Sequence, residues 1–337
     1  MLLSFEREPN YFAASNLCGE ETSVIAETSA GEAIGIYACT QFSLYLNGEV
    51  RPAIYLHNLR VDRRWRHRIS LLRGGFESIP KLIAGFGESA VCFTSVGSGN
   101  QTARRLLEAG VRGLPRYEWQ GDLITFALPC ASGGKGRSRV KLRRACDADI
   151  PALAAFHRQC AARWQFAPHL DESALRGGGG VRVEEFWLCE EEGAIRFCAA
   201  LCDQSGCKQV VVRGYRQPLR GLRLLYNCWA RLTGRVALPA IGERLSYLYM
   251  AFAAFDDDLL GRDRALALEC IEALLVCARG QGAQTVVLGL SADHPLQELI
   301  ARRLRSESYR TRIQTVVWQG QDALHISGSV QPEAALL

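Results

Sequence analysis

Residues 54–77 read IYLHNLRVDRRWRHRISLLRGGFE, and this stretch decides the fold. Its first eight residues, 54–61, are rich in β-branched and aromatic side chains and predict a strand. The basic segment 62–68 follows as a turn, and apolar residues then recur at helical spacing over residues 71–79. A strand that enters a helix through a basic loop points backbone N–H groups and the helix dipole at one place. That arrangement favours a phosphate or pyrophosphate, although a solvated connection between strand and helix gives the same pattern.

The segment LRVDRRWRHRISLL resembles the acetyl-CoA-binding signature of the GNAT acetyltransferase superfamily. In that family a strand ending in an aliphatic-x-Val segment is followed by a loop of pattern Arg/Gln-x-x-Gly-x-Gly/Ala and then by a helix. Arg66 takes the Arg/Gln position here, while Ile69 and Leu71 stand where the small residues are expected. Downstream, SGNQTARRLLEAG resembles the second signature of the family, Asn-x-x-Ala, with Asn100 and Ala103 matching.

The resemblance implies an acyl-CoA-dependent N-acyltransferase that moves an acetyl group from acetyl-CoA to an unknown amine by direct attack. It implies that strand backbone groups hold the pantetheine arm and that loop amides hold the pyrophosphate, with charge from neighbouring arginines at positions 63, 64, 66 and 68. The cofactor-binding residues that it implies are Leu59, Arg60, Val61, Arg66, His67, Arg68, Ile69, Ser70, Leu71, Asn100 and Ala103. Close approach of a backbone to pyrophosphate favours glycine, so Ile69 and Leu71 predict a narrowed or closed cradle.

Two residues are candidates for proton transfer. His57 lies four residues before Val61, where many relatives carry a glutamate, and an imidazole has a suitable pKa for a general base. The alternative for His57 is a structural histidine bonded to a neighbour on the sheet. The tyrosine that often protonates the leaving thiolate in this family corresponds to Leu107 here. Tyr117 is a candidate acid in its place, and water can also serve.

The order of elements in the first half recurs in the second half. Strand, loop, helix and strand follow one another from Val61 to Phe93 over 32 positions and from Phe255 to Leu288 over 33 positions. This repeat predicts an α/β protein of two GNAT-like domains, each a mixed, mostly antiparallel twisted sheet flanked by helices. We expect an acyl-CoA-binding domain at residues 1–130, a Gly-rich linker at 131–139, a second domain at 140–330 and a tail at 331–337.

The second domain is expected to be degenerate. Its loop begins with three acids at 256–258, which suit a helix N-terminus as caps but repel a pyrophosphate. Tyr247, Tyr249 and Tyr309 are predicted to lie in the core or along a cleft. We expect a helix at 218–232, inserted before the next strand, and Pro80 predicts a kink or an early stop in the first long helix.

Composition narrows the possible classes of protein. The chain has 337 residues, a net charge of +5 and 48% hydrophobic residues, enough for a sizeable core and two domains. No stretch of about 18 uncharged apolar residues occurs, and the N-terminus MLLSFEREPNYF is unlike a signal peptide, so we expect a cytoplasmic protein with no membrane partner. The modest basic excess fits an anionic cofactor, and nucleic acid is disfavoured because no basic face is interleaved with aromatic residues.

The thirteen cysteines are scattered and include no Cys-x-x-Cys. They are predicted to be small buried residues in a reducing compartment. The spacing of Cys189, Cys198, Cys202 and Cys207 matches no zinc pattern, so no metal is predicted.

The alternative function is a catalytically inactive binding or regulatory module that kept the fold. A nucleic-acid-binding protein would show steep salt dependence. The sequence leaves the acceptor, the acyl chain length and the oligomeric state open.

Overall fold

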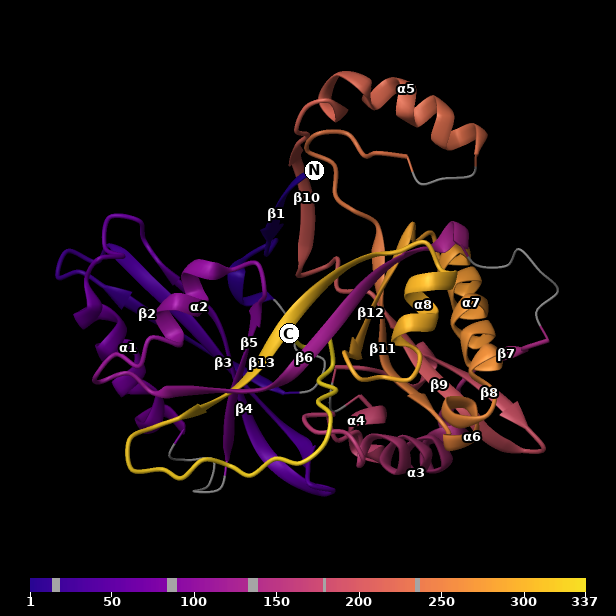
Figure 1. Cartoon of the computed structure of the whole chain (residues 1–337), viewed down its shortest axis with the longest axis horizontal. Helices are drawn as coiled ribbons and strands as arrows, with labels where there is room; N and C mark the ends of the chain where they lie inside the picture. Colours follow the sequence, from indigo (N-terminus) through magenta and orange to yellow (C-terminus); the bar gives the residue numbers. More distant parts are fainter. Residues whose placement is uncertain (14–18, 84–89, 133–138, 178–179, 234–236) are drawn as a thin grey trace.

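A computed structural model of the chain describes residues 1–13, 19–83, 90–132, 139–177, 180–233 and 237–337 (Figure 1). The strands are β1 (Leu2–Glu6), β2 (Glu20–Glu27), β3 (Ala33–Leu46), β4 (Glu49–Val61), β5 (Val91–Gly97), β6 (Arg116–Pro129), β7 (Leu142–Arg144), β8 (Phe186–Glu191), β9 (Ala194–Cys202), β10 (Gln209–Gly214), β11 (Tyr247–Phe255), β12 (Thr285–Ser291) and β13 (Glu307–Val317). The α-helices are α1 (Ile69–Ile83), α2 (Gln101–Leu107), α3 (Ile150–Ala161), α4 (Glu172–Leu175), α5 (Leu219–Leu232), α6 (Asp257–Gly261), α7 (Arg264–Gly280) and α8 (Gln297–Arg303).

Eleven strands form one continuous sheet in the order β2-β3-β4-β5-β13-β6-β12-β11-β9-β8-β7, while β1 pairs with β10 in a separate ribbon. The pairs β4–β5 and β11–β12 are parallel, and the other pairs of the large sheet are antiparallel. This arrangement is the mixed, mostly antiparallel sheet that the sequence predicted.

The last strands of the two halves cross over to each other. β6, from the first half, pairs with β12 of the second half. β13, from the second half, pairs with β5 of the first half. β6 and β13 also pair with each other along their whole length, from Glu307↔Ala127 to Val317↔Arg116. Each half therefore completes the sheet of the other. The domain bounds stay predictions, and most of the linker predicted at 131–139 lies outside the described residues.

The helices bury the faces that their apolar residues mark out. α1 turns Leu72, Phe76 and Ile79 inward, and in Figure 1 it lies with α2 beside the first-half strands, as α7 and α8 lie beside β11 and β12. The helix continues through Pro80 to Ile83. The predicted early stop at Pro80 is therefore wrong, because the buried face around Ile79 offsets the one backbone hydrogen bond that proline removes.

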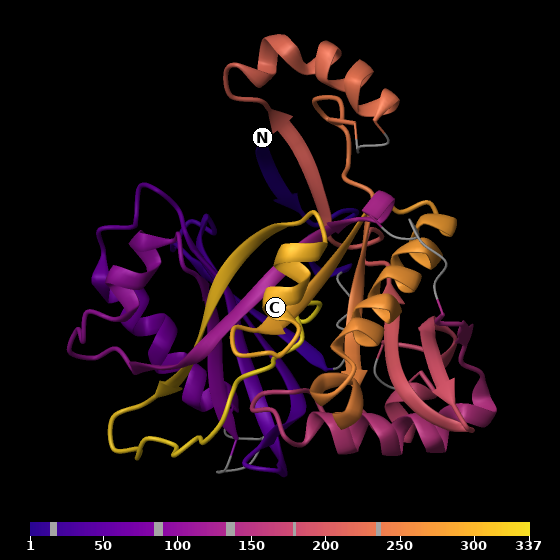
Figure 2. The same cartoon turned by 45° about the vertical axis from the view of Figure 1, so that its right-hand side comes forward.

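The segment after β13 returns across both halves of the molecule (Figure 2). Gln165 donates its backbone N–H to Ser329 O at 3.0 Å, and Gln331 N donates to Gln165 O at 2.7 Å. Val330 is buried in one cluster with Leu44 and Phe93 of the first half. This segment thus helps to hold the two halves in one body.

Candidate functional site

One large cavity, with a volume of about 1450 Å³, lies where the two halves meet. Its walls come from β4, α1, β5 and α2 of the first half and from β10, β11 and β13. Ten predicted site residues line it: His57, Leu59, Arg60, Val61, Arg66, Ser70, Leu71, Asn100, Ala103 and Tyr117. The other three, His67, Arg68 and Ile69, are not among the lining residues.

The cavity opens where β4 and β5 part. Their parallel pairing runs from Ala53↔Val91 to Leu56↔Thr94, and the Thr94 hydroxyl then donates to Leu56 O at 2.7 Å. Asn58 follows with a φ of 55°, in the left-handed region that asparagine tolerates better than most residues. The register between β3 and β4 shifts at this place, which is a β-bulge. Beyond the bulge, Leu59, Arg60 and Val61 of β4 line the cavity.

The second half repeats this backbone geometry. Phe252 in β11 has a φ of 53°, and the register against β9 shifts between Ala251 and Ala254. The parallel pairing of β11 with β12 ends at Tyr249↔Val287. The repeat predicted from element order therefore extends to a bulge at the corresponding strand of each half.

The basic loop after β4 directs one arginine at the cavity. Asp62 N donates to Ile34 O at 2.9 Å and fixes the start of the loop. Arg64 pairs with Asp62 at 3.1 Å and also with Glu32, away from the lining residues. The Arg68 guanidinium lies 4.3 Å from the centre of the Trp65 ring. Arg66 Nε donates to Val61 O at 3.0 Å, which holds this side chain at the cavity wall.

The residues at the predicted glycine positions differ in where they point. Ile69 packs against the core cluster that contains Leu72 and Phe76. Leu71 lines the cavity. Only one of the two large side chains therefore narrows the predicted cradle, and the cavity is not closed.

The second predicted signature is a capped helix start. The Asn100 side chain accepts a hydrogen bond from Ala103 N at 3.2 Å, at the N-terminus of α2. Both residues face the cavity.

His57 lies at the inner end of β4 within a buried polar cluster. One ring nitrogen is 2.8 Å from Thr40 Oγ1, and the other accepts from Asn58 Nδ2 at 2.9 Å. Glu21 Oε2 lies 3.8 Å from His57 Nε2, and this buried oxygen has no hydrogen-bond partner among the described residues. Burial lowers the pKa of His57 from 6.5 to about 3, with smaller contributions from the charges of Arg7 and Lys208. The ring is therefore neutral at neutral pH.

Several hydroxyl groups share the cavity with His57. Burial raises the pKa of Tyr117 far above its usual range, so this phenol keeps its proton. Tyr37 and Tyr55 bond to the hydroxyls of Ser78 and Ser95, each at 2.6 Å.

Other parts of the chain supply cavity residues that the sequence did not mark as site residues. Arg7 comes from the segment after β1, and Lys208 precedes β10. Burial lowers the pKa of Lys208, as does the charge of Arg7. Tyr247, Tyr249 and Tyr309 also line the cavity, which confirms the predicted position along a cleft. No local motif marks Arg7 or Lys208, because strand pairing between distant segments brings them here.

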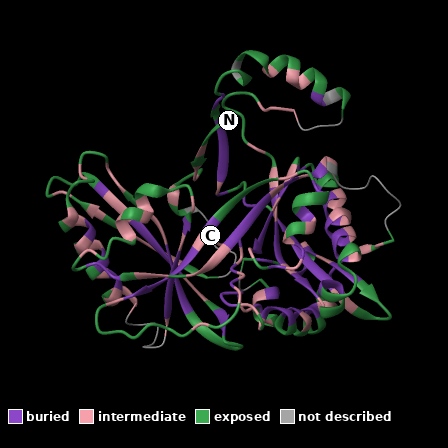
Figure 3. Cartoon of the chain, in the orientation of Figure 1, coloured by how far each residue is buried: buried purple, intermediate pink, exposed green. Residues whose placement is uncertain are grey.

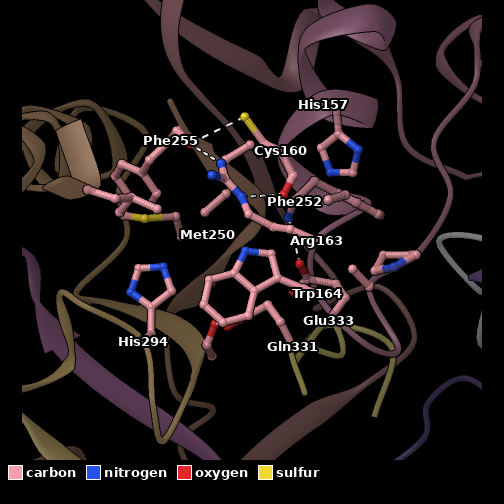
Figure 4. A pocket seen from close by; sticks show the side chains of 17 residues that line it. His157, Cys160, Arg163, Trp164, Met250, Phe252, Phe255, His294, Gln331 and Glu333 are labelled. Atoms are coloured by element: carbon pink, nitrogen blue, oxygen red, sulfur yellow. Dashed lines mark hydrogen bonds between the residues drawn. The ribbon is translucent and has the colours of Figure 1, made fainter. Parts of the chain in front are cut away.

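The corresponding place in the second half is filled by the chain itself (Figure 4). The cavity there measures only about 40 Å³. The backbone N–H of Phe252, at the bulge, donates to Glu333 Oε2 at 2.6 Å. Trp164 stacks on His294 with ring centres 5.3 Å apart, and Arg163 Nη2 donates to Phe255 O at 2.9 Å.

The acids of the second-half loop cap helix α6 and form ion pairs with arginines. Asp256 accepts from Leu259 N at 2.8 Å as the N-cap of α6, which confirms the predicted capping role. It also pairs with Arg196 at 2.6 Å, while Asp257 pairs with Arg163.

No protein-family model matches the sequence, and no curated protein matches it. Solved structures do match. A GCN5-related N-acetyltransferase from Sphaerobacter thermophilus superposes with a TM-score of 0.55 at 15% identity, over 89% of this chain and 82% of that one. Saccharomyces cerevisiae N-myristoyltransferase with bound myristoyl-CoA gives a TM-score of 0.53 at 11% identity, over 85% and 67%.

The chain has the GNAT fold. This confirms the fold class predicted from residues 54–77, and at these identities the likeness concerns the fold. The chain spans 62% of the length of a related N-acetyltransferase from Anabaena variabilis, which superposes with a TM-score of 0.45 at 12% identity over 87% of this chain.

The described residues contain neither a helix that could cross a membrane nor a cluster of metal ligands. None of the helices within these residues is both long and apolar enough to cross a membrane. Within the same residues, no three His, Cys, Asp or Glu side chains gather in a way that could hold a metal ion. Cys189, Cys198, Cys202 and Cys207 are all buried.

Proposed function

We propose that this protein is an acyl-CoA-dependent N-acyltransferase whose site is the large cavity of the first half. The observation that carries the proposal is the parting of β4 and β5 at the Asn58 bulge, with Arg66 beside it. A GNAT fold supports the same assignment, although a fold by itself does not assign chemistry.

The cavity fits a CoA thioester in size and in chemistry. Its volume of about 1450 Å³ exceeds the range of roughly 300–1,000 Å³ that is typical of pockets for drug-sized ligands. The β4 edge at Leu59 and Val61 offers backbone groups to the amides of a pantetheine arm. Arg66 offers a guanidinium for charge-assisted bonds to a pyrophosphate, and Ser70 lies in the first turn of α1, where backbone N–H groups favour anions.

In the proposed reaction, the bound thioester supplies an activated acyl group. The nitrogen of the acceptor amine forms a bond to the acyl carbon, and the carbon–sulfur bond breaks. His57, neutral at neutral pH, takes the proton that the amine loses. Its low pKa makes it a weak base, and Glu21 Oε2 at 3.8 Å would stabilise the charged ring. The thiolate then receives a proton from the phenol of Tyr117, which is protonated at neutral pH, or from water.

The acetyl group is our proposal for the acyl chain, and a cytoplasmic location is our proposal for the compartment. Cys146 and Cys228 are free and exposed, which fits a reducing compartment. The acceptor amine remains to be identified by screening.

Calorimetric titration with acetyl-CoA, CoA and a long-chain acyl-CoA tests the proposal. We expect micromolar binding of acetyl-CoA to the intact chain and a loss of about tenfold or more in Arg66→Ala, since one charge-assisted contact disappears. Arg63→Ala is the matched control, because Arg63 is an exposed arginine of the same loop outside the cavity lining. Absence of binding at millimolar ligand, or equal affinity in the two variants, would remove the loop from the site.

An inactive binding module is the second candidate, and the filled second half favours it in part. There, the same bulge carries no open cavity. Binding of CoA without acyl transfer to any amine of a broad panel would support this candidate over the enzyme.

A further inference from the structure

Helix α5 turns an apolar face away from its own protein. Leu222, Leu225, Trp229 and Leu232 follow one another at spacings of three, four and three residues, which places them on one face. Their exposed fractions are 48%, 68%, 43% and 87%. A surface helix of a globular protein normally directs such a stripe at the core.

The opposite side of α5 is the one that contacts the protein. Arg223 Nη1 donates to Pro239 O at 2.7 Å. Asn227 Nδ2 donates to Leu238 O at 2.9 Å, and Leu238 N donates back to Asn227 Oδ1 at 2.7 Å. Ala230 is buried on this side. The polar residues thus fasten α5 to the segment that follows it, and the leucines are left facing outward.

The pictures agree on where this helix lies. In Figures 1 and 2, α5 stands clear of the large sheet at the end of the β1–β10 ribbon. Figure 3 shows the helix mostly exposed. In both views α5 therefore lies apart from the large sheet and the helices that flank it.

The sequence on and around the helix is rich in arginine. Residues 209–247 contain seven arginines and one acidic residue. Arg216, before α5, and Arg244, after it, are both exposed. Tyr226 and Trp229 pack with ring centres 5.7 Å apart beside the leucine stripe. Apolar residues on one face, aromatic residues at its edge and basic residues nearby are the features of a helix that lies in a membrane interface.

We propose that α5 docks the protein on an anionic lipid surface. The helix lies in the plane of the interface, with Leu222, Leu225 and Leu232 among the acyl chains and the exposed Arg216 and Arg244 among the headgroups. The cytoplasmic leaflet carries such anionic lipids. This inference goes beyond the proposed acyltransferase activity and departs from the sequence-based expectation of no membrane partner. A helix that lies on a bilayer needs no membrane-spanning length.

A second copy of the chain fits the same face less well. A helix of 14 residues is about 21 Å long and about 10 Å wide, so its face covers on the order of 200 Å². A stable protein interface needs about 800 Å² from each partner. Two copies would also bring their arginine-rich segments together, and like charges repel.

Vesicle co-sedimentation of the full chain tests the proposal. The vesicles are phosphatidylcholine alone, or phosphatidylcholine with one third phosphatidylglycerol. The test variant is Leu225→Gln with Leu232→Gln. The control variant is Ile25→Gln with Leu324→Gln, which removes two exposed apolar residues elsewhere, at 43% and 45% exposure. Thermal unfolding and acetyl-CoA titration of both variants monitor the fold and the cavity, so that a failure of the activity proposal is seen separately.

We expect the intact chain and the control to bind the anionic vesicles, more weakly at high salt, and the test variant to bind at least tenfold less. Equal binding to both vesicle types would overturn the proposed preference for anionic lipid. Equal binding by the test variant, or no binding by the intact chain, would overturn the docking role of α5. A dimer of the intact chain in light scattering that becomes a monomer in the test variant, without vesicle binding, would assign the face to a second copy instead.

Discussion

Mild acid should destabilise this protein because three histidines are held neutral inside it. The pKa of His57 and that of His294 are lowered from 6.5 to about 3, and the pKa of His157 to about 4. Burial is the main cause in each, and the charges of Arg163 and Arg264 also act on His294. Their folded pKa values lie below the unfolded value, so the folded state binds protons less readily. The stability that they contribute is complete above pH 6.5 and is lost as pH falls below it.

The size of the effect follows from the pKa differences. At pH 5, which is 1.5 units below the unfolded pKa, each histidine lowers the free energy of unfolding by about 2 kcal/mol. The three together lower it by about 6 kcal/mol. Glu333 acts in the opposite direction, because burial raises its pKa from 4.5 to about 7. Between pH 7 and pH 5 it takes up a proton in the folded state, and this raises the free energy of unfolding by about 2 kcal/mol. The net loss of about 4 kcal/mol is a large part of the 5–15 kcal/mol that stabilises a typical domain.

Urea unfolding at pH 7, 6 and 5 measures this loss directly. His157→Gln and His294→Gln should each reduce the loss in free energy of unfolding between pH 7 and pH 5 by about 2 kcal/mol. His325→Gln is the control, since His325 is exposed. A free energy of unfolding that stays constant from pH 7 to 5, or a loss of equal size in all three variants, would refute the reasoning.

Three further predictions concern the sheet and the cavity. Asn58→Val should lower the free energy of unfolding by about 1–2 kcal/mol relative to Asn58→Gly, because valine resists the left-handed backbone; equal urea midpoints would contradict this. Gly289→Ala should lower the free energy of unfolding by about 1–3 kcal/mol, since its Cβ would lie 2.6 Å from Ala334 Cβ. Gly261→Ala is the control because its Cβ meets open space, and equal melting temperatures of the two variants would contradict the prediction. His57→Gln should lower turnover on the order of 100-fold while the calorimetric affinity for acetyl-CoA stays unchanged, and full activity would exclude His57 as the base.

The sequence predicted what local patterns determine. The β4 strand, the basic loop and α1 follow from residues 54–77 because each has its own periodicity and composition, and α1 contains the whole apolar repeat predicted at residues 71–79. The capped start of α2 at Asn100 is local in the same way. Most residues taken from these two segments accordingly meet at one cavity.

The exchange of β6 and β13 could not be predicted in this way. Both segments can be identified as strands from their sequences, but a pattern of period two identifies a strand and not its partner. Sequential order would pair β6 with β5, whereas β13 takes that place. Arg7 and Lys208 were missed for the same reason, since their position depends on the pairing of β1 with β10, about 200 residues later in the chain.

The two halves also show why the same backbone geometry does not give the same cavity in each half. Asn58 and Phe252 occupy equivalent bulges with nearly the same φ. At Phe252 the backbone N–H is satisfied by the Glu333 carboxylate, and Trp164 and Arg163 fill the space beside it. Asn58 instead lines the large cavity, together with Ala334, Leu336 and Leu337 of the C-terminal segment. The open cavity and the filled one differ in whether the chain itself supplies a partner for the backbone at the bulge. Residues far from either strand in the sequence decide this difference.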